Sequence, residues 1–564
     1  MSIIILKYKN IKKKMFNKYL QNCKKYKIAK EEVIKFSLFF LFIFSFYLFS
    51  IDIDAKKYIN YDLPDCGLQK AIDECFSSGG GTVKIPEGVF KLRRGLLLKN
   101  KVNIEGSGID KTILIYGKEI FKINVNKKNE GNKIFLEYIP EKMEIGSAIV
   151  LCRTFPPSWY GEPRPAYIKE INKEEKFLTV EAPYGIVELK PPDGCIIFGD
   201  SFYLERDIKK GDTEIYLKST STLKEGEEIA IGEPPNESLL AHSFIKEIKG
   251  NKIILESPVS IDFKAEPKSE ELGNKKINVL IWSVFPLIHG ANVEDIKISN
   301  LTIKGTVGKN LWTTQGRYTV AGIHIYNGKN IVIEKVKVTE WHTDGISLQE
   351  GNNCIVRDCE VIKCLGNGIH PGTGLKNTII ENNKIIENGQ GIYFCWHNSG
   401  HIIRNNVIAK NRSHGIGGLG NPGDVNNLIE SNHIYENGAA GIEINGGKKS
   451  NNQIIKNIIE NNSKSQPGKF PGIMIYASSE DAMNYTIKGN IIRDTQNEKT
   501  QYIGIEEKNG KYRDKPTFAD FNIIEDNELI GHIKADIIIV GQNTVCKNNK
   551  AEKIELPVKE KSEN

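Results

Sequence analysis

Outside its first 35 residues, this 564-residue chain has almost no net charge. The whole chain carries +7, but its first 35 residues hold eleven Lys and two Glu, which leaves 66 basic and 68 acidic side chains for the rest. A body that binds nucleic acid would need a basic excess. The near-neutral body therefore argues against a nucleic acid as partner.

The ten cysteines lack the patterns that mark a disulfide framework or a metal site. Cys23 lies in the basic leader, and the other nine are an odd number with no framework spacing and no C-x-x-C pair. Cys354, Cys359, Cys364 and Cys395 fall on different parts of successive repeats. We interpret these four as small apolar core residues, and no disulfide is predicted.

An uncharged run, FSLFFLFIFSFYLFSI, follows the basic leader from Phe36 to Ile51. A basic segment followed by an apolar one is typical of an export signal. Sixteen residues is short for a spanning helix, and no small-x-small cleavage site follows. The sequence predicts a secreted, periplasmic or cell-surface protein. Its leader, 1–51, is either a cleaved signal or a retained anchor, and only the anchor would contact a membrane.

A repeat occupies the C-terminal half of the chain. The dipeptide Gly-Ile recurs at steps of 23, 23, 23, 24, 26, 31 and 32 residues, beginning at Gly322, Gly345, Gly368, Gly391, Gly415, Gly441, Gly472 and Gly504. The units hold short β-runs with no amphipathic helix between them, which indicates a solenoid. We predict an all-β protein in which 281–550 form a parallel β-helix, one coil per unit.

The pattern I-x-x-N-x-[IL] places an asparagine at one equivalent position in five coils, at Asn383, Asn406, Asn432, Asn490 and Asn527. Coils stack about 4.8 Å apart, so equivalent residues form columns. A buried asparagine column is stable when each amide bonds to its neighbour and to turn backbone. We therefore interpret these asparagines as structural.

The segment 52–125 contains LQKAIDECFSSGGGTVKIPEGVF, which indicates a short helix, a Gly turn and strands. This segment resembles the opening of the pectate-lyase-like superfamily, whose fold is the right-handed parallel β-helix. The resemblance implies a helix that caps the open end of the solenoid and a first coil at Gly79 to Gly88. A cap is also needed physically, because an uncovered end is a bare sheet edge.

The segment 126–280 interrupts the solenoid and is itself duplicated. GNKIFL, MEIGSAI, AYIKEI and FLTVEAP in the first copy correspond to GDTEIYL, LKEGEEI, SFIKEI and KIILESP in the second. We predict two small β-modules packed beside or over the β-helix. A charged tail, 551–564, ends the chain.

Six of the ten histidines fall between residues 324 and 414. The position after Gly-Ile, which we predict to face outward, carries His324, Ser347, His370, Tyr393, Gly417 and Glu443. The start of these strands adds Trp341, His342, Asp344, Asn367, Gln390, Arg412 and His414, and the CWHN segment adds Trp396 and His397. Titratable and aromatic side chains on adjacent coils favour a functional groove over a merely polar surface.

Two segments, HTDGI at 342–346 and SHGIGGLG at 413–420, resemble motifs of the polygalacturonase family of inverting glycoside hydrolases. The resemblance implies that Asp344 is a catalytic carboxylate and His414 an active-site histidine. The family's paired aspartates one coil later are absent here, however, and its Arg-x-Lys motif is replaced by Glu-x-Asn at 443–445.

Inverting hydrolysis also needs a second carboxyl group about 6.5 to 9.5 Å from the first. Asp344 and Glu443 lie four coils apart, about 19 Å at the stacking distance. That pair is therefore too widely spaced.

Proton abstraction fits these outward-facing and strand-entry residues, which we call the strip, better than hydrolysis does. Cleaving or epimerising a uronic-acid polymer requires a base, a group that neutralises the carboxylate, and an acid. His370 and Tyr393 lie on adjacent coils, about 5 Å apart at the backbone, and are predicted to serve as base and acid. The strip is completed by groups expected to bind the sugar: Arg412 with Asn367 or Gln390 on the carboxylate, Trp341 or Trp396 on a ring, and His324, His397 and Glu443 alongside.

Two roles stay open for Asp344. It can orient His342 or His370, or it can help to hold a calcium ion. No dense acidic cluster is present, so no metal site is predicted and calcium is the one cofactor left open.

The sequence thus predicts a monomeric polysaccharide lyase or epimerase that acts on an acidic polysaccharide. A glycoside hydrolase is the alternative within the enzymes. A non-catalytic β-helix that binds glycan or builds the cell envelope is the alternative outside them. A metal-handling β-helix of the copper-export kind is a third possibility, motivated by histidines and cysteines that show no ligand spacing.

Overall fold

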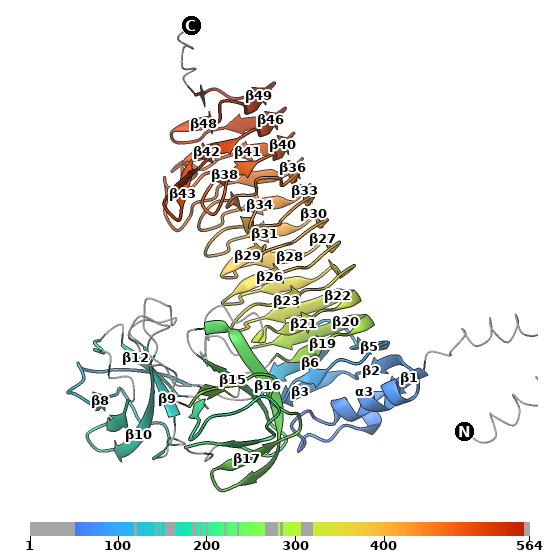
Figure 1. Ribbon diagram of the computed structural model, residues 1–564, viewed down its shortest axis with the longest axis vertical. Coiled ribbons are helices and arrows are strands. Elements are labelled where there is room, and N and C mark those ends of the chain that lie inside the picture. The colour runs from blue at the N-terminus through green and yellow to red at the C-terminus, as the bar shows by residue number, and fades with distance from the viewer. Residues whose placement is uncertain are drawn as a thin grey trace, which may run out of the picture. The chain divides into compact units, whose positions relative to one another are not determined.

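Figure 1 shows the computed structural model of the chain, which describes residues 51–557 apart from short gaps. The gaps are 118–120, 142, 144, 147, 153–163, 183–185, 187, 192–193, 199–200, 219, 221–222, 234–235, 266–279, 283–285 and 306–319. Nearly all of the predicted leader (1–50) and the end of the predicted tail (558–564) lie outside the described residues. In the described part of the chain, no helix is both long and apolar enough to cross a membrane.

The predicted parallel β-helix is confirmed. Each coil adds strands in parallel register to the coil before it, and the coils stack in sequence order in Figure 1. A twelve-stranded sheet forms one wall, from β4 (Leu96–Leu97) to β50 (Ile554–Glu555), and a 22-stranded sheet supplies the other walls. The Gly-Ile coils contribute to the twelve-stranded wall β21 (Ile323–Tyr326), β23 (Ile346–Gln349), β26 (Asn367–Pro371), β29 (Gln390–Tyr393), β32 (Ile416–Leu419), β35 (Ile442–Ile444), β38 (Ile473–Tyr476) and β42 (Ile503–Lys508).

The isoleucine after each repeat glycine forms a column in the core. Successive members face one another in register and are fully buried: Ile323, Ile346, Ile369, Ile392, Ile416, Ile442 and Ile473. Alternate residues of a strand point to opposite faces, so the position after each isoleucine lies on the outside. Each buried isoleucine contributes about 1.5 to 3 kcal/mol relative to exposure.

The asparagine column is also confirmed. Side-chain amides of successive coils bond Nδ2 to Oδ1 at 2.9–3.0 Å, through Asn383, Asn406, Asn432, Asn457, Asn490, Asn527 and Asn549. Each Nδ2 also donates to a backbone carbonyl, for example Asn432 to Ile403 O at 2.9 Å. A second column of the same kind joins Asn388, Asn411, Asn437 and Asn462. The turns are therefore buried without leaving these amides unsatisfied.

Three of the four repeat cysteines are core residues, as predicted. Cys354, Cys359 and Cys364 are each 1% exposed. The backbone N–H groups of Cys359 and Cys364 donate to Asn383 and Asn388, both at 2.9 Å, so these cysteines stand where the two asparagine columns begin. For the fourth, Cys395, the prediction is wrong, because it lies two residues after the end of β29 and is partly exposed.

A short helix, α3 (Leu68–Ser77), packs against β2 (Gly81–Lys84) and β5 (Val102–Glu105) of the first coils. Its apolar residues Leu68, Ala71, Ile72 and Cys75 recur at helical spacing and are buried. Covering strand edges in this way removes a site where another chain could pair.

In the sequence, two six-stranded antiparallel modules separate the first coils from the rest of the β-helix, although β4 of the first coils pairs directly with β19 (Ile288–Ala291) of the next. The first module has the order β7 (Phe121–Asn124), β12 (Cys195–Phe198), β9 (Ala148–Cys152), β10 (Arg164–Asn172), β11 (Phe177–Glu181), β8 (Lys133–Phe135). The second has the order β13 (Ser201–Tyr203), β18 (Leu280–Trp282), β15 (Glu228–Glu233), β16 (Asn236–Lys249), β17 (Lys252–Leu255), β14 (Glu214–Tyr216). The two strand orders are identical with every number raised by six, and each module has its own hydrophobic core.

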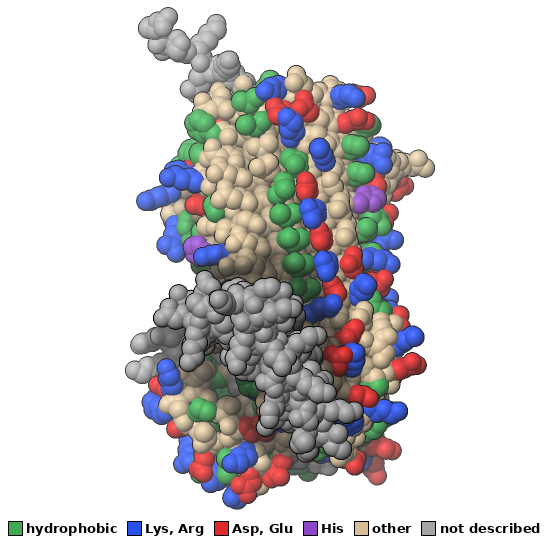
Figure 2. Space-filling model, turned by 90° about the vertical axis from the view of Figure 1, so that its right-hand side faces the viewer, with side chains coloured by type: hydrophobic (Ala, Val, Ile, Leu, Met, Phe, Trp, Pro, Cys, Tyr) green, Lys and Arg blue, Asp and Glu red, His purple; other side chains and the backbone are tan. Residues whose placement is uncertain are grey.

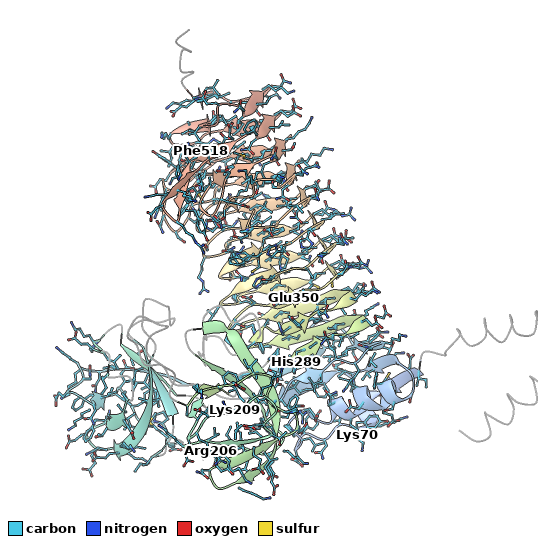
Figure 3. The ribbon with its side chains drawn as sticks, viewed as in Figure 1. Lys70, Arg206, Lys209, His289, Glu350 and Phe518 are labelled. Carbon is cyan, nitrogen blue, oxygen red and sulfur yellow. The ribbon has the colours of Figure 1, made fainter. Side chains whose placement is uncertain are left out.

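The second module docks on the first coils through a buried carboxylate. Glu228 of β15 is fully buried; its Oε2 accepts a hydrogen bond from the Gly95 backbone at 2.8 Å, and its Oε1 lies 3.2 Å from His289 Nε2. Beside it, the Arg94 guanidinium lies 3.5 Å from the centre of the Phe244 ring. Figure 3 labels His289, which lies in β19 (Ile288–Ala291) of the twelve-stranded wall.

The outer face of the 22-stranded sheet carries charges of alternating sign. Arg357 lies 2.5 Å from Glu334 of the preceding coil, and Arg404 lies 2.7 Å from Glu381 of its preceding coil. Figure 2 shows acidic and basic side chains alternating beside a stripe of hydrophobic ones. This face is a self-paired surface, so the charges offer little to an outside partner.

Candidate active site

The outward column of the twelve-stranded wall holds the predicted strip in register. His324 faces Ser347, Ser347 faces His370, and Tyr393 faces Gly417. Ile369 pairs with Ile392, which places His370 beside Tyr393. The column also extends one coil further, to His289, which pairs with His324. No Gly-Ile precedes His289, but the dipeptide Ile-His that it shares with His324 and His370 is a signal that could have found it.

A central group of four side chains, Asp344, His370, Tyr393 and Cys395, forms around His370. His370 Nδ1 donates to Asp344 Oδ2 at 2.7 Å, and the two residues are 4% and 1% exposed. Asp344 Oδ1 accepts from the backbone N–H of Asn367 at 2.7 Å. The Tyr393 ring meets the His370 ring edge to face, with centroids 5.3 Å apart. His370 is therefore fixed in orientation on one side and touches the phenol of the next coil on the other.

Opposing effects set the protonation of His370. Burial lowers its pKa, but hydrogen bonds to Asp344 and to Cys395 raise the pKa by more than burial lowers it. The net result is a pKa of about 9 for His370. Burial raises the pKa of Tyr393 to about 12. At neutral pH the imidazole is therefore charged and the phenol holds its proton.

Cys395 is the fourth member of the central group. Its thiol shares a hydrogen bond with His370, and its sulfur lies 3.1 Å from the hydroxyl of Thr373. Although burial raises the pKa of Cys395, its bonds to His370 and Thr373 more than offset burial and lower it. Sequence reasoning missed this role, because cysteines elsewhere in the repeats are core residues.

A second pair lies farther along the wall. His414 Nδ1 accepts from the Ala440 backbone at 3.2 Å, so its proton is on Nε2, which lies 3.2 Å from Glu443 Oε1. Burial lowers the pKa of His414 more than Glu443 raises it. Glu443 Oε2 in turn accepts from the Gly418 backbone at 3.3 Å.

A side chain at Gly417 or Gly418 would come close to groups of the adjacent coils. A Cβ at Gly417 would lie 2.3 Å from Gln390 Nε2, and one at Gly418 would lie 2.6 Å from the Tyr393 ring. Gly418 also has a φ of +71°, which side chains rarely adopt. The absence of a Cβ at these two positions thus leaves room for the Tyr393 ring and for the end of the Gln390 side chain.

Two predicted site residues lie in the interior instead. Trp341 is fully buried, donates from Nε1 to Val320 O at 2.8 Å and packs edge-on against Tyr116. His342 is 1% exposed and stacks on Trp341 with ring centroids 4.4 Å apart, and burial lowers its pKa to about 3. The expectation that Trp341 stacks on a sugar, or that His342 acts as a base oriented by Asp344, is therefore wrong for this structure: both are held in an aromatic cluster.

The remaining predicted residues stand around the central group. Asn367 and Gln390 are partly exposed and face each other in register. Trp396 is 55% exposed, and His397 beside it is exposed as well. Arg412 donates from Nη2 to Leu365 O at 2.5 Å, two residues before Asn367. His324 is partly buried and lies two coils before His370 in the same outward column.

Asp424 is an acid near the site that sequence reasoning did not identify. It is 1% exposed, and Oδ1 accepts from the Asn398 backbone at 2.8 Å. Burial, together with the nearby charge of Cys395, raises the pKa of Asp424 to about 8. The turn sequence NPGD around it could have signalled a buried turn carboxylate.

The residues around Asp344 do not fit a calcium ion. One carboxylate oxygen is engaged by His370 and the other by the Asn367 backbone. Calcium needs six to eight oxygen ligands. Across the described ranges, no group of three or more His, Cys, Asp or Glu side chains is placed to hold a metal ion.

Comparison with known proteins supports the fold. Residues 321–492 match the family described as right handed beta helix region, so the right-handed parallel β-helix predicted for the chain is confirmed. No curated protein sequence matches the chain.

Solved structures similar to this chain include the A-module of the mannuronan C-5 epimerase AlgE6 of Azotobacter vinelandii, at 13% identity and a TM-score of 0.46, covering 88% of this chain and 98% of that one. The surface adhesin PfbA of Streptococcus pneumoniae is similar at 14% identity and a TM-score of 0.46, covering 91% and 97%. An exopolygalacturonase of Thermotoga maritima is similar at 11% identity and a TM-score of 0.40, covering 90% and 92%. At these identities the likeness does not extend to substrate or mechanism.

Proposed function

We propose that this chain is a polysaccharide lyase or epimerase that acts on a polymer containing uronic acid. The observation that carries the proposal is the contact of His370 with Tyr393 on adjacent coils, with His370 anchored by Asp344. Because adjacent coils are about 5 Å apart, we assign both rings to one sugar unit.

His370 and Tyr393 take the roles of base and acid. Nδ1 of His370 is engaged by Asp344, so Nε2 receives the proton from the carbon next to the sugar carboxylate. The phenol of Tyr393, with its pKa raised to about 12, still carries a proton to give. In a lyase that proton goes to the leaving glycosidic oxygen as the carbon–oxygen bond breaks. In an epimerase the Tyr393 proton is instead delivered to the abstracted carbon from the opposite face.

Proton abstraction next to a carboxylate also needs a group that offsets the growing negative charge. Arg412 is the cation of the strip, and its guanidinium reaches the turn at Leu365, beside Asn367. Asn367 faces Gln390 on the next coil. We assign these three side chains to the sugar carboxylate, and the exposed Trp396 to the face of a neighbouring sugar ring.

The test is a panel of acidic polymers offered to the purified chain. Polygalacturonate, alginate and glycosaminoglycans are incubated with the protein while ultraviolet absorbance of unsaturated sugars is followed, and solvent deuterium incorporation is followed by NMR. We expect either unsaturated product or deuterium at the abstracted position with at least one polymer. Reducing ends without unsaturation would support the hydrolase alternative, and binding without turnover would support the non-catalytic one.

Activity is expected to depend on pH through His370. Since the hydrogen bonds to Asp344 and Cys395 raise its pKa to about 9, the neutral imidazole that can act as base forms as pH rises through that value. Turnover should therefore increase as pH rises, with a midpoint near pH 9, and level off above it. Asp344→Asn removes the negative charge that lies beside the imidazole, so the midpoint should move to lower pH.

The imidazole titration can be read independently of turnover, from the ring proton shifts of His370 by NMR. His433→Gln provides a control, because His433 lies in β34 (His433–Tyr435) of the other sheet and pairs with Glu460. A midpoint that stays in place in Asp344→Asn, or turnover that is fastest in acid, would contradict the assignment of His370 as base.

A further inference from the structure

The side chains of Cys395, His370 and Asp344 form a continuous chain of hydrogen bonds. Asp344 Oδ2 accepts from His370 Nδ1 at 2.7 Å. His370 and Cys395 hydrogen-bond to each other. The hydroxyl of Thr373 lies 3.1 Å from the sulfur on another side. A carboxylate that orients an imidazole, which in turn contacts a thiol, is the arrangement that activates a sulfur nucleophile.

The backbone holds the thiol at this place. The N–H of Cys395 donates to Pro371 O at 3.1 Å, and the N–H of Phe394 donates to Gly417 O at 2.9 Å, so the residue is tied to coils on both sides. Cys395 is nevertheless partly exposed, and the two residues after it, Trp396 and His397, are exposed. The residue that carries the thiol is therefore partly open to solvent.

We propose that Cys395 is a reactive thiolate, paired with the His370 imidazolium, and that it is a site of covalent modification by small electrophiles, hydroperoxides in particular. The thiolate attacks the terminal oxygen of the hydroperoxide, an S–O bond forms and the O–O bond breaks. The alkoxide that leaves takes the proton of the His370 imidazolium and becomes an alcohol. Sulfur is oxidised to a sulfenic acid and the peroxide is reduced, so no other reactant is needed.

Cys546 provides an internal comparison. It is also partly exposed, but its sulfur accepts a hydrogen bond from Asn549 at 3.4 Å, and burial raises its pKa. The pKa of Cys395 is lowered, chiefly by His370 acting against burial. The reactive form of a thiol is the thiolate, so two partly exposed cysteines of one chain should differ in rate at the same pH.

The test measures both cysteines in the full chain after reduction and removal of the reductant. Iodoacetamide is added at a series of pH values, and alkylation of each cysteine is followed by peptide mass spectrometry. We expect Cys395 to reach half its maximal rate below the pKa of an ordinary cysteine, about 8.5, and to react about tenfold faster than Cys546 near pH 6.5. Hydrogen peroxide followed by dimedone should label Cys395 and leave Cys546 unlabelled.

Variants separate the imidazole from the fold. His370→Ala should shift the alkylation profile of Cys395 to higher pH, Thr373→Val should shift it less, and His433→Gln should leave it unchanged. An unshifted profile in His370→Ala, or a wild-type Cys395 that titrates like Cys546, would overturn the proposal. The wild-type comparison decides the matter even if His370→Ala does not fold. No polysaccharide enters these measurements, so the inference stands or falls separately from the proposed lyase or epimerase activity.

Discussion

Replacing His370 with alanine is expected to lower the rate of proton abstraction from the polymer by about 10²- to 10⁴-fold, the range that a positioned acid or base contributes. Tyr393→Phe should lower it by a similar factor, because the ring contact with His370 remains while the proton donor is lost. Both effects should appear in kcat more than in KM, since neither side chain is assigned to hold the substrate.

The matched control is again His433→Gln, which removes an imidazole that is paired with Glu460 on the other sheet. Circular dichroism and thermal unfolding of each variant show whether the coils are intact. Full turnover in folded His370→Ala or in folded Tyr393→Phe would exclude the pair as base and acid. Loss of turnover in His433→Gln would show that the assay responds to the fold instead.

Replacing Asn432 with alanine is expected to lower the free energy of unfolding by about 3 to 5 kcal/mol. Its Oδ1 accepts from both the backbone and the side chain of Asn406, at 3.0 and 2.9 Å, and its Nδ2 donates to Ile403 O at 2.9 Å. All of these partners are buried, and alanine would leave them unsatisfied. Urea unfolding followed by circular dichroism measures the change.

Gln453→Ala is the control for this second prediction. Gln453 begins the neighbouring strand β36 (Gln453–Ile455), and its side chain is exposed. Its loss should change the free energy of unfolding by no more than about 0.5 kcal/mol. Equal effects of the two substitutions would mean that the asparagine column does not stabilise the coils.

The coils could be predicted from sequence because two periodicities coincide. The repeat of 23 to 32 residues sets where each coil begins, and the alternation within a strand sets which side chains face the core. His370 and Tyr393 lie inside strands, where both rules apply, and the structure places them next to each other.

The errors fall where those rules end. Trp341 and His342 precede β23, outside the alternating strand, so the sequence does not say whether they face inward. Their burial follows from a packing partner, Tyr116, that is more than 200 residues away in the chain. Cys395 and Asp424 follow strands in turns whose path depends on neighbouring coils. Contacts of this kind are set by tertiary structure, and the local sequence pattern does not predict them.

The stacking of coils through parallel ladders has a mechanical consequence. A pull on the two ends would load the hydrogen bonds between neighbouring coils along their own direction, and the bonds of one coil would give way together. Each event would release the 23 to 32 residues of a single coil, or about 80 to 110 Å of extended chain. The β-helix would then lengthen in discrete steps, one coil at a time, and would dissipate mechanical work over many small unfolding events.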